Sequence, residues 1–316
     1  MFSGVGNTTR DPPGQVLALY LQYVGLVASQ LLTVAGNLIV LLSFYVDPLL
    51  RKPKYYYIFS MAAADLIVGV FSMPIYSLYL MLGYWPFTTT ACDVWLSIDY
   101  ACCEVSVLHL IMISVDRLWS IKNPIQYRSA MNSSKAIATI AAGWVIPFIA
   151  YFVVIFGWPY YGRGSRPTVE CYVPFLIESP LCVTLLTAFA YWIPTAIIWT
   201  IYANIYFTVV VKVDNELERS RSRRCVGEKA ARKTLTLIIG VFFTTWSPYS
   251  LVVIILSYHP YSIPTSIYHF CYYLCYINST LNPVCYALSI VRFKRAFQTL
   301  LCTKKNEIHK WTIRPR

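Results

Sequence analysis

Residues 95–117 read WLSIDYACCEVSVLHLIMISVDR, an apolar run with Asp99 near its start and an acid–base pair, Asp116-Arg117, at its end. Ionisable side chains inside a membrane span are costly, so they mark function. Arg117 follows Asp99 by eighteen residues, which is five helical turns or roughly 27 Å along the axis. We expect both to share one helix face near opposite ends of a membrane, an arrangement suited to binding a cation on one side and changing a contact on the other.

The whole chain has the composition of an integral membrane protein. Of its 316 residues, 57% are hydrophobic and only 13% are charged, with a mean hydropathy of +0.54. Seven apolar stretches each reach the roughly 20 residues that a membrane-spanning helix needs. These stretches are 17–45, 54–82, 89–122, 134–157, 180–212, 229–258 and 264–289. We therefore expect an all-α membrane protein, a seven-transmembrane helix bundle at 17–289, with no room for a second folded domain.

The basic residues predict the orientation, because cytoplasmic loops collect Lys and Arg. Assigning the loops in order places Arg10, Arg163 and Arg166 on one side and the other 23 of the 26 basic residues on the other side. We expect a multi-pass plasma-membrane protein with an extracellular tail at 1–16, an amphipathic membrane-surface helix at 290–302 and a cytoplasmic tail at 303–316. The net charge of +12 favours contact with anionic membrane lipid over nucleic acid.

Three modifications follow from this topology. Asn7 heads an Asn-Thr-Thr sequon in the outer tail and is a glycosylation candidate. Cys92 and Cys171 are the two of ten cysteines that fall clearly in the oxidising compartment, so we expect a disulfide between them. Cys302 follows the amphipathic stretch IVRFKRAFQTLL and is a palmitoylation candidate, with an unmodified thiol as the alternative.

Several polar residues fall at similar depths on different spans, where lipid-facing side chains would be apolar. One carboxylate ringed by oxygen donors suits a small hard cation such as sodium. The alternative is a hydrogen-bond network around a protonated acid. The residues of this predicted sodium site are Asp65, Ser106, Asn278, Ser279 and Asn282, with Asn37 nearby.

A second polar set lies in the outer half of the bundle, around Asp99. Tyr249 lies one turn beyond Trp246, and Tyr272 lies one turn before Tyr276. A carboxylate with several tyrosines forms a cage for an ammonium group, because each ring adds a cation–π attraction of about 0.5 to 2 kcal/mol. Tyr100 could supply one more ring.

Taken together, the motifs resemble those of the rhodopsin-like (class A) G-protein-coupled receptors, over nearly the whole chain. They are Gly36-Asn37, LIVGV after Asp65, Asp116-Arg117, Trp144, Pro194, Trp246-Ser247-Pro248-Tyr249, and Asn282-Pro283 followed by Tyr286.

The resemblance implies that Arg117 contacts a heterotrimeric G protein in the active state and pairs with Glu228 at rest. A contact with two arrangements can be biased by a distant ligand. The alternative is that the side chains of Arg117 and Glu228 only extend to the polar membrane interface, without pairing. Arrestin is a further implied partner. The implied activation switch comprises Asp116, Arg117, Tyr202, Glu228, Phe242, Asn282, Pro283 and Tyr286.

Within that family, the chain is most similar to the aminergic branch, and above all to the muscarinic acetylcholine receptors. The segments ACDVWLSIDY, LIMISVDR, ARKTL and CYINSTLNPVCYAL carry this likeness. It implies a receptor for a small ammonium ligand, with acetylcholine as the first choice. The implied ligand-binding residues are Asp99, Tyr100, Cys103, Thr187, Ala190, Trp246, Tyr249, Ser250, Tyr272 and Tyr276.

Other features depart from the muscarinic pattern. Ser250 stands where those receptors have an asparagine, and only about 16 residues link spans five and six. The segments IIGVFFTTWSPYSL and WLSIDY resemble histamine receptors, so histamine or another biogenic amine is the alternative. Glu104 lies about 140° around the helix from Asp99. Glu104 is therefore either a buried, hydrogen-bonded acid or a second ligand contact.

Other functional classes fit less well. No lysine in span seven could hold retinal, and we find no inverted repeat of the kind that transporters carry. The four histidines are widely scattered, so we expect neither an enzyme nor a cofactor, apart from an allosteric sodium ion. A seven-span membrane protein without a signalling role remains the alternative from a different class.

Overall fold

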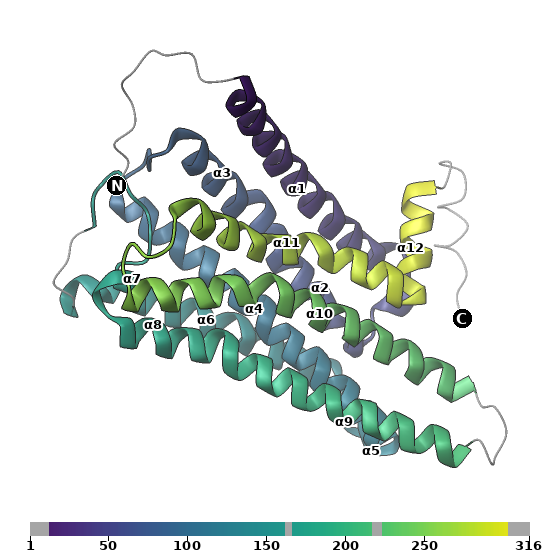
Figure 1. Ribbon diagram of the computed structural model, residues 1–316. Coiled ribbons are helices and arrows are strands. Elements are labelled where there is room, and N and C mark those ends of the chain that lie inside the picture. The colour runs from purple at the N-terminus through teal and green to yellow at the C-terminus, as the bar shows by residue number, and fades with distance from the viewer. Residues whose placement is uncertain (1–12, 162–165, 217–222, 303–316) are drawn as a thin grey trace.

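The computed structural model describes residues 13–161, 166–216 and 223–302, which form one bundle of long helices (Figure 1). The predicted glycosylation site Asn7 and the predicted cytoplasmic tail at 303–316 lie outside the described residues. The long helices of the bundle are α1 (Pro13–Val46), α2 (Pro53–Ile67), α3 (Met73–Leu82), α4 (Thr89–Lys122), α6 (Ser133–Tyr161), α8 (Pro180–Thr187), α9 (Ile193–Glu216), α10 (Arg223–Tyr258) and α11 (Thr265–Ser289).

The remaining helices lie at the ends of the bundle. They are a 3₁₀ turn at Pro48–Leu50, α5 (Pro124–Ala130), α7 (Phe175–Glu178) and α12 (Val291–Cys302). No strand occurs among the described residues. The axis of α12 turns by 106° from that of α11, so α12 crosses the end of the bundle, as Figure 1 shows.

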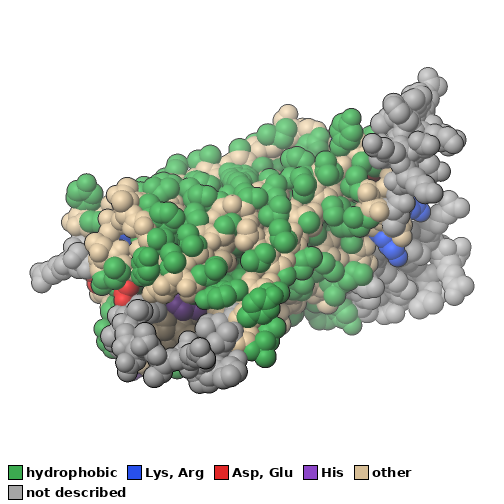
Figure 2. Space-filling view, turned by 90° about the horizontal axis from the view of Figure 1, so that it is seen from above, with side chains coloured by type: hydrophobic (Ala, Val, Ile, Leu, Met, Phe, Trp, Pro, Cys, Tyr) green, Lys and Arg blue, Asp and Glu red, His purple; other side chains and the backbone are tan. Residues whose placement is uncertain are grey.

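The prediction of an all-α membrane bundle is confirmed. In the described part of the chain, six helices are long and apolar enough to cross a membrane, and α11 with the bent α12 makes a seventh candidate. One face of the molecule is mostly apolar along its length, with charged side chains gathered towards the two ends (Figure 2). That distribution is what a lipid-embedded bundle requires, since charges are stable only near the membrane surfaces.

Two of the spans are interrupted by a π-helical turn that the sequence reading did not foresee. One turn covers Val68–Ser72 between α2 and α3, and the other covers Ala188–Trp192 between α8 and α9. A proline follows two residues after each turn, at Pro74 and Pro194. Proline lacks an N–H and crowds the preceding turn, and a widened turn relieves both effects. The two turns thus decide which side chains of these spans face the bundle interior.

The centre of the bundle is α4, which packs against α2, α6 and α9. Its start is capped by Thr88, whose side chain accepts a hydrogen bond from the amide of Ala91. Elsewhere, α1 approaches α11 closely, since a Cβ on Gly36 would lie 3.0 Å from the Cγ of Pro283. A glycine at this position therefore allows the two helices to meet.

The loop after α6 lies at the end of the bundle that we expect to face outwards, and two neighbouring contacts fix it to α4. The predicted disulfide between Cys92 and Cys171 is confirmed. Beside it, the Arg166 guanidinium donates to the Asp93 carboxylate at 2.6 Å and to the carbonyl of Tyr172 at 2.8 Å. These contacts hold the loop over the outer end of the bundle.

Candidate functional site

Asp99 lies in the outer half of α4 and is only 2% exposed. Two hydroxyl groups of α11 donate to its carboxylate, Tyr272 at 2.5 Å and Tyr276 at 3.1 Å. Tyr272 and Tyr276 are one helical turn apart, so both face α4. This buried carboxylate is thereby held by two phenols, and no basic side chain of the described residues forms an ion pair with it.

Aromatic rings surround this carboxylate. The Tyr272 ring lies 5.2 Å from that of Tyr249, 5.6 Å from that of Tyr276 and 6.3 Å from that of Tyr100, edge to face in all three pairs. The hydroxyls of Tyr100 and Tyr249 are 2.6 Å apart and hydrogen-bonded. The predicted tyrosine cage is therefore assembled from α4, α10 and α11, with the negative charge of Asp99 inside it.

The cage encloses a small cavity of about 260 Å³. Its walls include Cys103 and Trp246 besides Asp99 and the tyrosines, as predicted, and also Cys275, which the sequence reading did not single out. A positively charged ligand is favoured here, because the Asp99 carboxylate is buried and the faces of the rings are electron-rich. The site is suited to a compact ammonium group.

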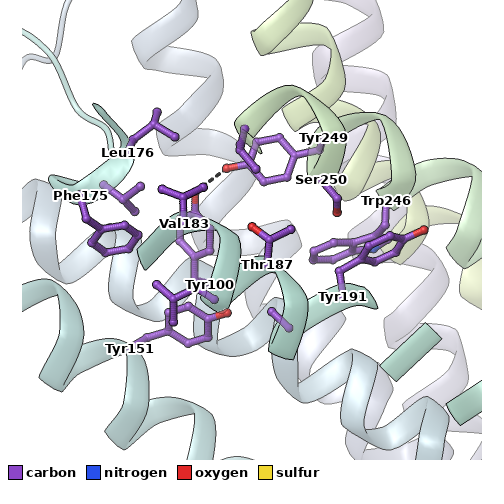
Figure 3. A pocket seen from close by; sticks show the side chains of 14 residues that line it. Tyr100, Tyr151, Phe175, Leu176, Val183, Thr187, Tyr191, Trp246, Tyr249 and Ser250 are labelled. Carbon is purple, nitrogen blue, oxygen red and sulfur yellow. Dashed lines mark hydrogen bonds between the residues drawn. The ribbon is translucent and has the colours of Figure 1, made fainter. Parts of the chain in front are cut away.

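A larger cavity of about 590 Å³ adjoins the cage, and we call it the annex (Figure 3). The annex shares Tyr100, Tyr249 and Trp246 with the cage, and the hydrogen bond between the two tyrosines lies at the boundary. Its other walls come from α6, from the loop with α7, from the span of α8 and α9, and from α10. These residues are Tyr151, Val173, Phe175, Leu176, Val183, Leu186, Thr187, Ala190, Tyr191, Ser250 and Val253.

The predicted contacts Thr187, Ala190 and Ser250 are therefore brought together in the annex, on the far side of the tyrosine pair from Asp99. Tyr151, Val183 and Tyr191 were missed. Tyr151 could have been identified as a tyrosine in the middle of an apolar span. The orientation of Val183 and Tyr191 on span five depends on the π turn, which the sequence did not reveal.

A third and widest cavity, of about 1290 Å³, lies further out between the loop and α11. Figure 2 shows a hollow beside a histidine side chain at this end of the molecule. Its floor is a stack of rings in which Tyr76 lies 4.5 Å from Tyr272 and 5.9 Å from Trp95, and the Tyr76 hydroxyl is hydrogen-bonded to His269 at 2.7 Å. Since Tyr272 lines both this cavity and the cage, it separates them.

Glu104, the predicted second acid, does not line the cage, the annex or the outer cavity. It is half-buried on α4, one helical turn from Tyr100. No hydrogen bond or ion pair of its side chain is found among the described residues. Glu104 thus lacks the hydrogen bonds predicted for a buried acid, and its predicted contact with the ligand remains a prediction.

Deeper in the bundle, Asp65 is completely buried and accepts three hydrogen bonds. Ser106 and Ser279 donate to one oxygen at 3.0 and 2.8 Å, and Asn282 donates to the other at 2.8 Å. The structure therefore brings four of the five predicted sodium-site residues into one cluster.

Asn278 differs from the prediction, because its side chain turns away from Asp65. Its amide donates to the Thr245 hydroxyl at 3.2 Å, and its carbonyl accepts a hydrogen bond from Asn282 at 3.4 Å. Asn37 donates to the backbone of Ser279 at 3.0 Å, which leaves its own Oδ1 buried and without a partner. Register on α11 explains this, since Asn278 precedes Ser279 and so projects towards α10 rather than α2.

At the inner end of α4, Asp116 accepts a hydrogen bond from Tyr127 of α5 at 2.7 Å. Burial and the neighbouring carboxylate raise the pKa of the Tyr127 phenol above its ordinary value, so Tyr127 remains a donor at neutral pH. The side chain of Glu228 lies outside the described residues, and the predicted pair with Arg117 therefore remains a prediction.

The other residues of the predicted switch make separate contacts within the bundle. The Phe242 ring is 6.0 Å from that of Trp246, at the floor of the cage. Tyr286 is buried and donates to the sulfur of Met61 at 3.2 Å, while Tyr202 accepts a hydrogen bond from Thr236 at 2.9 Å. In this structure, Tyr286 and Tyr202 have different partners on different helices.

Comparison with known proteins places these features in a family. Residues 36–286 match the 7 transmembrane receptor (rhodopsin family). The chain is 26% identical to the muscarinic acetylcholine receptor M1 of Sus scrofa and of Homo sapiens, over 90% of this chain and 89% of each relative. It is 37% identical to the muscarinic acetylcholine receptor M3 of Gallus gallus, over 65% of this chain and 32% of that receptor.

Proposed function

Because this chain belongs to the rhodopsin family of seven-transmembrane receptors, we propose that it binds a small ammonium ligand at Asp99 and activates a heterotrimeric G protein at the opposite end of the bundle. The observation that supports this most strongly is the buried carboxylate of Asp99 beside a ring-lined cavity. An ammonium ion satisfies such a site better than a neutral ligand, through its charge and through cation–π attraction.

Acetylcholine is the first candidate ligand. The relatives named above are acetylcholine receptors, and the trimethylammonium group of acetylcholine is compact enough for a cage walled by Tyr100, Tyr249, Tyr272 and Tyr276. Histamine is the second candidate, because the segments IIGVFFTTWSPYSL and WLSIDY resemble histamine receptors.

The N-terminus is extracellular in this proposal, as the basic residues predict. The outer cavity then opens to the extracellular side, and the end with Asp116 and Arg117 faces the cytoplasm. Trp246 and Phe242 connect the floor of the cage to the inner half of α10. A ligand that repacks Trp246 would thereby shift the inner end of that helix, where the G protein binds. Arrestin binding, glycosylation at Asn7 and palmitoylation at Cys302 belong to the same proposal.

We also propose that the Asp65 cluster holds a sodium ion. Its groups are a carboxylate and the hydroxyls of Ser106 and Ser279, with the unpartnered Oδ1 of Asn37 close to Ser279. This all-oxygen set fits a hard cation. The described residues contain no cluster of three or more His, Cys, Asp or Glu side chains that could hold a metal ion. A sodium ion there would stabilise one arrangement of α2, α4 and α11.

The test is a concentration–response panel on cells that express the chain, with G-protein dissociation as the readout. The panel contains acetylcholine, histamine, serotonin, dopamine, octopamine and tyramine. A response to acetylcholine at the lowest concentration supports the first candidate, and a response to histamine alone supports the second. Silence towards every amine, with surface expression verified, would overturn the proposal and favour a seven-span protein without this signalling role.

A further inference from the structure

His269 lies near the start of α11 and lines the outer cavity, but it does not line the cage. It precedes Tyr272 by three residues, so both side chains fall on the same face of the helix. Its Nδ1 is hydrogen-bonded to the Tyr76 hydroxyl at 2.7 Å, and the rings of Tyr79 and Tyr268 lie 6.2 and 5.5 Å from the imidazole. Tyrosines of two helices therefore hold this imidazole in place.

Tyr76 connects His269 to Tyr272, the residue that separates the outer cavity from the cage. The Tyr76 side chain is 2% exposed, and its ring is stacked on Trp95 at 5.9 Å and on Tyr272 at 4.5 Å. In the described part of the chain, the bond to His269 is the one hydrogen bond found for the Tyr76 hydroxyl. A buried hydroxyl without a partner costs free energy, so this bond fixes where the Tyr76 ring lies.

Tyr272 closes the passage from the outer cavity to Asp99. Its hydroxyl donates to the Asp99 carboxylate, and its ring is stacked on that of Tyr76. Swinging the Tyr272 ring out of the passage either breaks this stack or carries Tyr76 along, and the second movement breaks the bond to His269. A stacked aromatic pair and a buried hydrogen bond both resist separation. The position of Tyr76, fixed by His269, therefore opposes opening of the passage.

We propose that His269 is a positioning residue, which holds Tyr76 against Tyr272 and thereby slows the movement of the ammonium ligand between the outer cavity and the cage. We call the hydrogen-bonded pair of Tyr76 and His269 the latch. The inference rests on the proposed function, because the ligand that passes is the amine bound at Asp99. Neither residue of the latch lines the cage, so its loss should speed entry and exit alike and leave the equilibrium affinity nearly unchanged. Loss of a cage tyrosine, in contrast, weakens binding itself.

The thiols of Cys103 and Cys275 can report on the passage, because both line the cage and are free. The probe is 2-(trimethylammonio)ethyl methanethiosulfonate, which forms a mixed disulfide with a thiol and releases methanesulfinate. With the purified full chain in lipid nanodiscs, this cation reaches the cage through the passage and not through lipid, where its charge is costly. The labelling rate, followed by peptide mass, measures how often the passage opens. The double variant Cys103→Ser/Cys275→Ser gives the background from other cysteines.

Tyr76→Phe keeps the ring and removes the hydroxyl, so labelling should become roughly fivefold faster, the factor that one ordinary hydrogen bond contributes. His269→Leu should have the same effect, and His269→Gln, whose amide can still bond to the hydroxyl, should restore most of the original rate. The double variant Tyr76→Phe/His269→Leu should be no faster than either single variant, because the two residues act through one bond. Tyr79→Phe is the matched control and should leave the rate unchanged, since its hydroxyl meets the amide of Cys171 instead.

Tetramethylammonium separates the latch from the ligand site. It should protect the cage thiols, and the concentration that gives half protection should be nearly the same in Tyr76→Phe as in the unaltered chain. Unchanged labelling in Tyr76→Phe and His269→Leu, additive effects in the double variant, or a half-protecting concentration that rises with the labelling rate would overturn the inference. If His269→Leu expresses poorly, the comparison of Tyr76→Phe with Tyr79→Phe carries the test. Failure of the proposed function looks different, because tetramethylammonium would then give no protection while the labelling rates still test the latch.

Discussion

Asp99 and Asp65 are both buried acids, 2% and 0% exposed, yet the structure surrounds them differently. Asp99 accepts hydrogen bonds from two tyrosines of α11 and borders a cavity. Asp65 accepts hydrogen bonds from short side chains of α4 and α11, and its cluster lines none of the three outer cavities. A carboxylate among rings and empty space can exchange phenol donors for a ligand, whereas one among serines and an asparagine has room only for a small ion.

The largest effect should come from Asp99→Asn. Losing one partner of a buried charge pair costs about 3 kcal/mol or more, so amine affinity should fall roughly a hundredfold. Competition binding on membranes measures this, with surface labelling to verify expression. Asp65→Asn is the matched control, since it removes the other buried acid and should leave binding in sodium-free buffer nearly intact. Unchanged affinity in Asp99→Asn would remove the proposed anchor.

Arg117→Ala tests whether ligand binding at one end of the bundle can be separated from G-protein activation at the other. Arg117 lies far from the cage along α4, so amine affinity should stay within about threefold, because distant sites are usually independent. G-protein dissociation should fall at least roughly tenfold, because the cytoplasmic contact is lost. Parallel binding and dissociation assays on the same cells measure both. A variant that signals normally would show that the switch does not act through Arg117.

Variants of Tyr272 separate the contribution of its ring to ligand affinity from that of its hydroxyl. Tyr272→Ala removes a ring and should lower affinity about tenfold, in line with about 1.4 kcal/mol for one cation–π contact. Tyr272→Phe keeps the ring and loses only the hydroxyl bond to Asp99, so the loss should be about threefold. Competition binding with tetramethylammonium compares the two variants. If the phenylalanine variant loses as much as the alanine variant, the hydroxyl rather than the ring holds the ligand.

The smallest change in ligand affinity should come from the Asp65 cluster. In the unaltered chain, sodium should shift agonist affinity by about fivefold or more, as typical allosteric couplings do. Asp65→Asn should abolish this shift, and Ser279→Ala should reduce it. Agonist competition in sodium buffer against potassium buffer measures the shift at constant ionic strength. A sodium effect that survives Asp65→Asn would leave this cluster as a hydrogen-bond network.

Much of the fold was accessible from the sequence. Each of the seven predicted stretches coincides with helix, and α4 runs from Thr89 to Lys122 as expected for 89–122. Apolar stretches of this length have few alternatives in a membrane, because backbone groups must be satisfied within each helix. The π turns at Val68–Ser72 and Ala188–Trp192 were not predictable, since periodicity alone does not reveal one extra residue in a turn.

The candidate site was predicted unevenly. Tyr272 and Tyr276 were identified by their one-turn spacing, which geometry within a single helix fixes. Tyr151 and Tyr76 were missed because their roles depend on how α6 and α3 pack against α4. The contact of Asn278 was mispredicted for the same reason, since the rotation of α11 about its axis decides whether this side chain faces Asp65 or Thr245.

The sequence by itself determined that the chain is a helical membrane bundle with two costly acids, Asp65 and Asp99, placed on its spans. Hydropathy and spacing are properties of single segments, so they can be read without knowing the packing. Only the tertiary structure decided which acid faces a cavity, and that the hydrogen-bonded Tyr100 and Tyr249 hydroxyls lie between cage and annex. Those outcomes depend on the rotation and approach of neighbouring helices, which no single segment specifies.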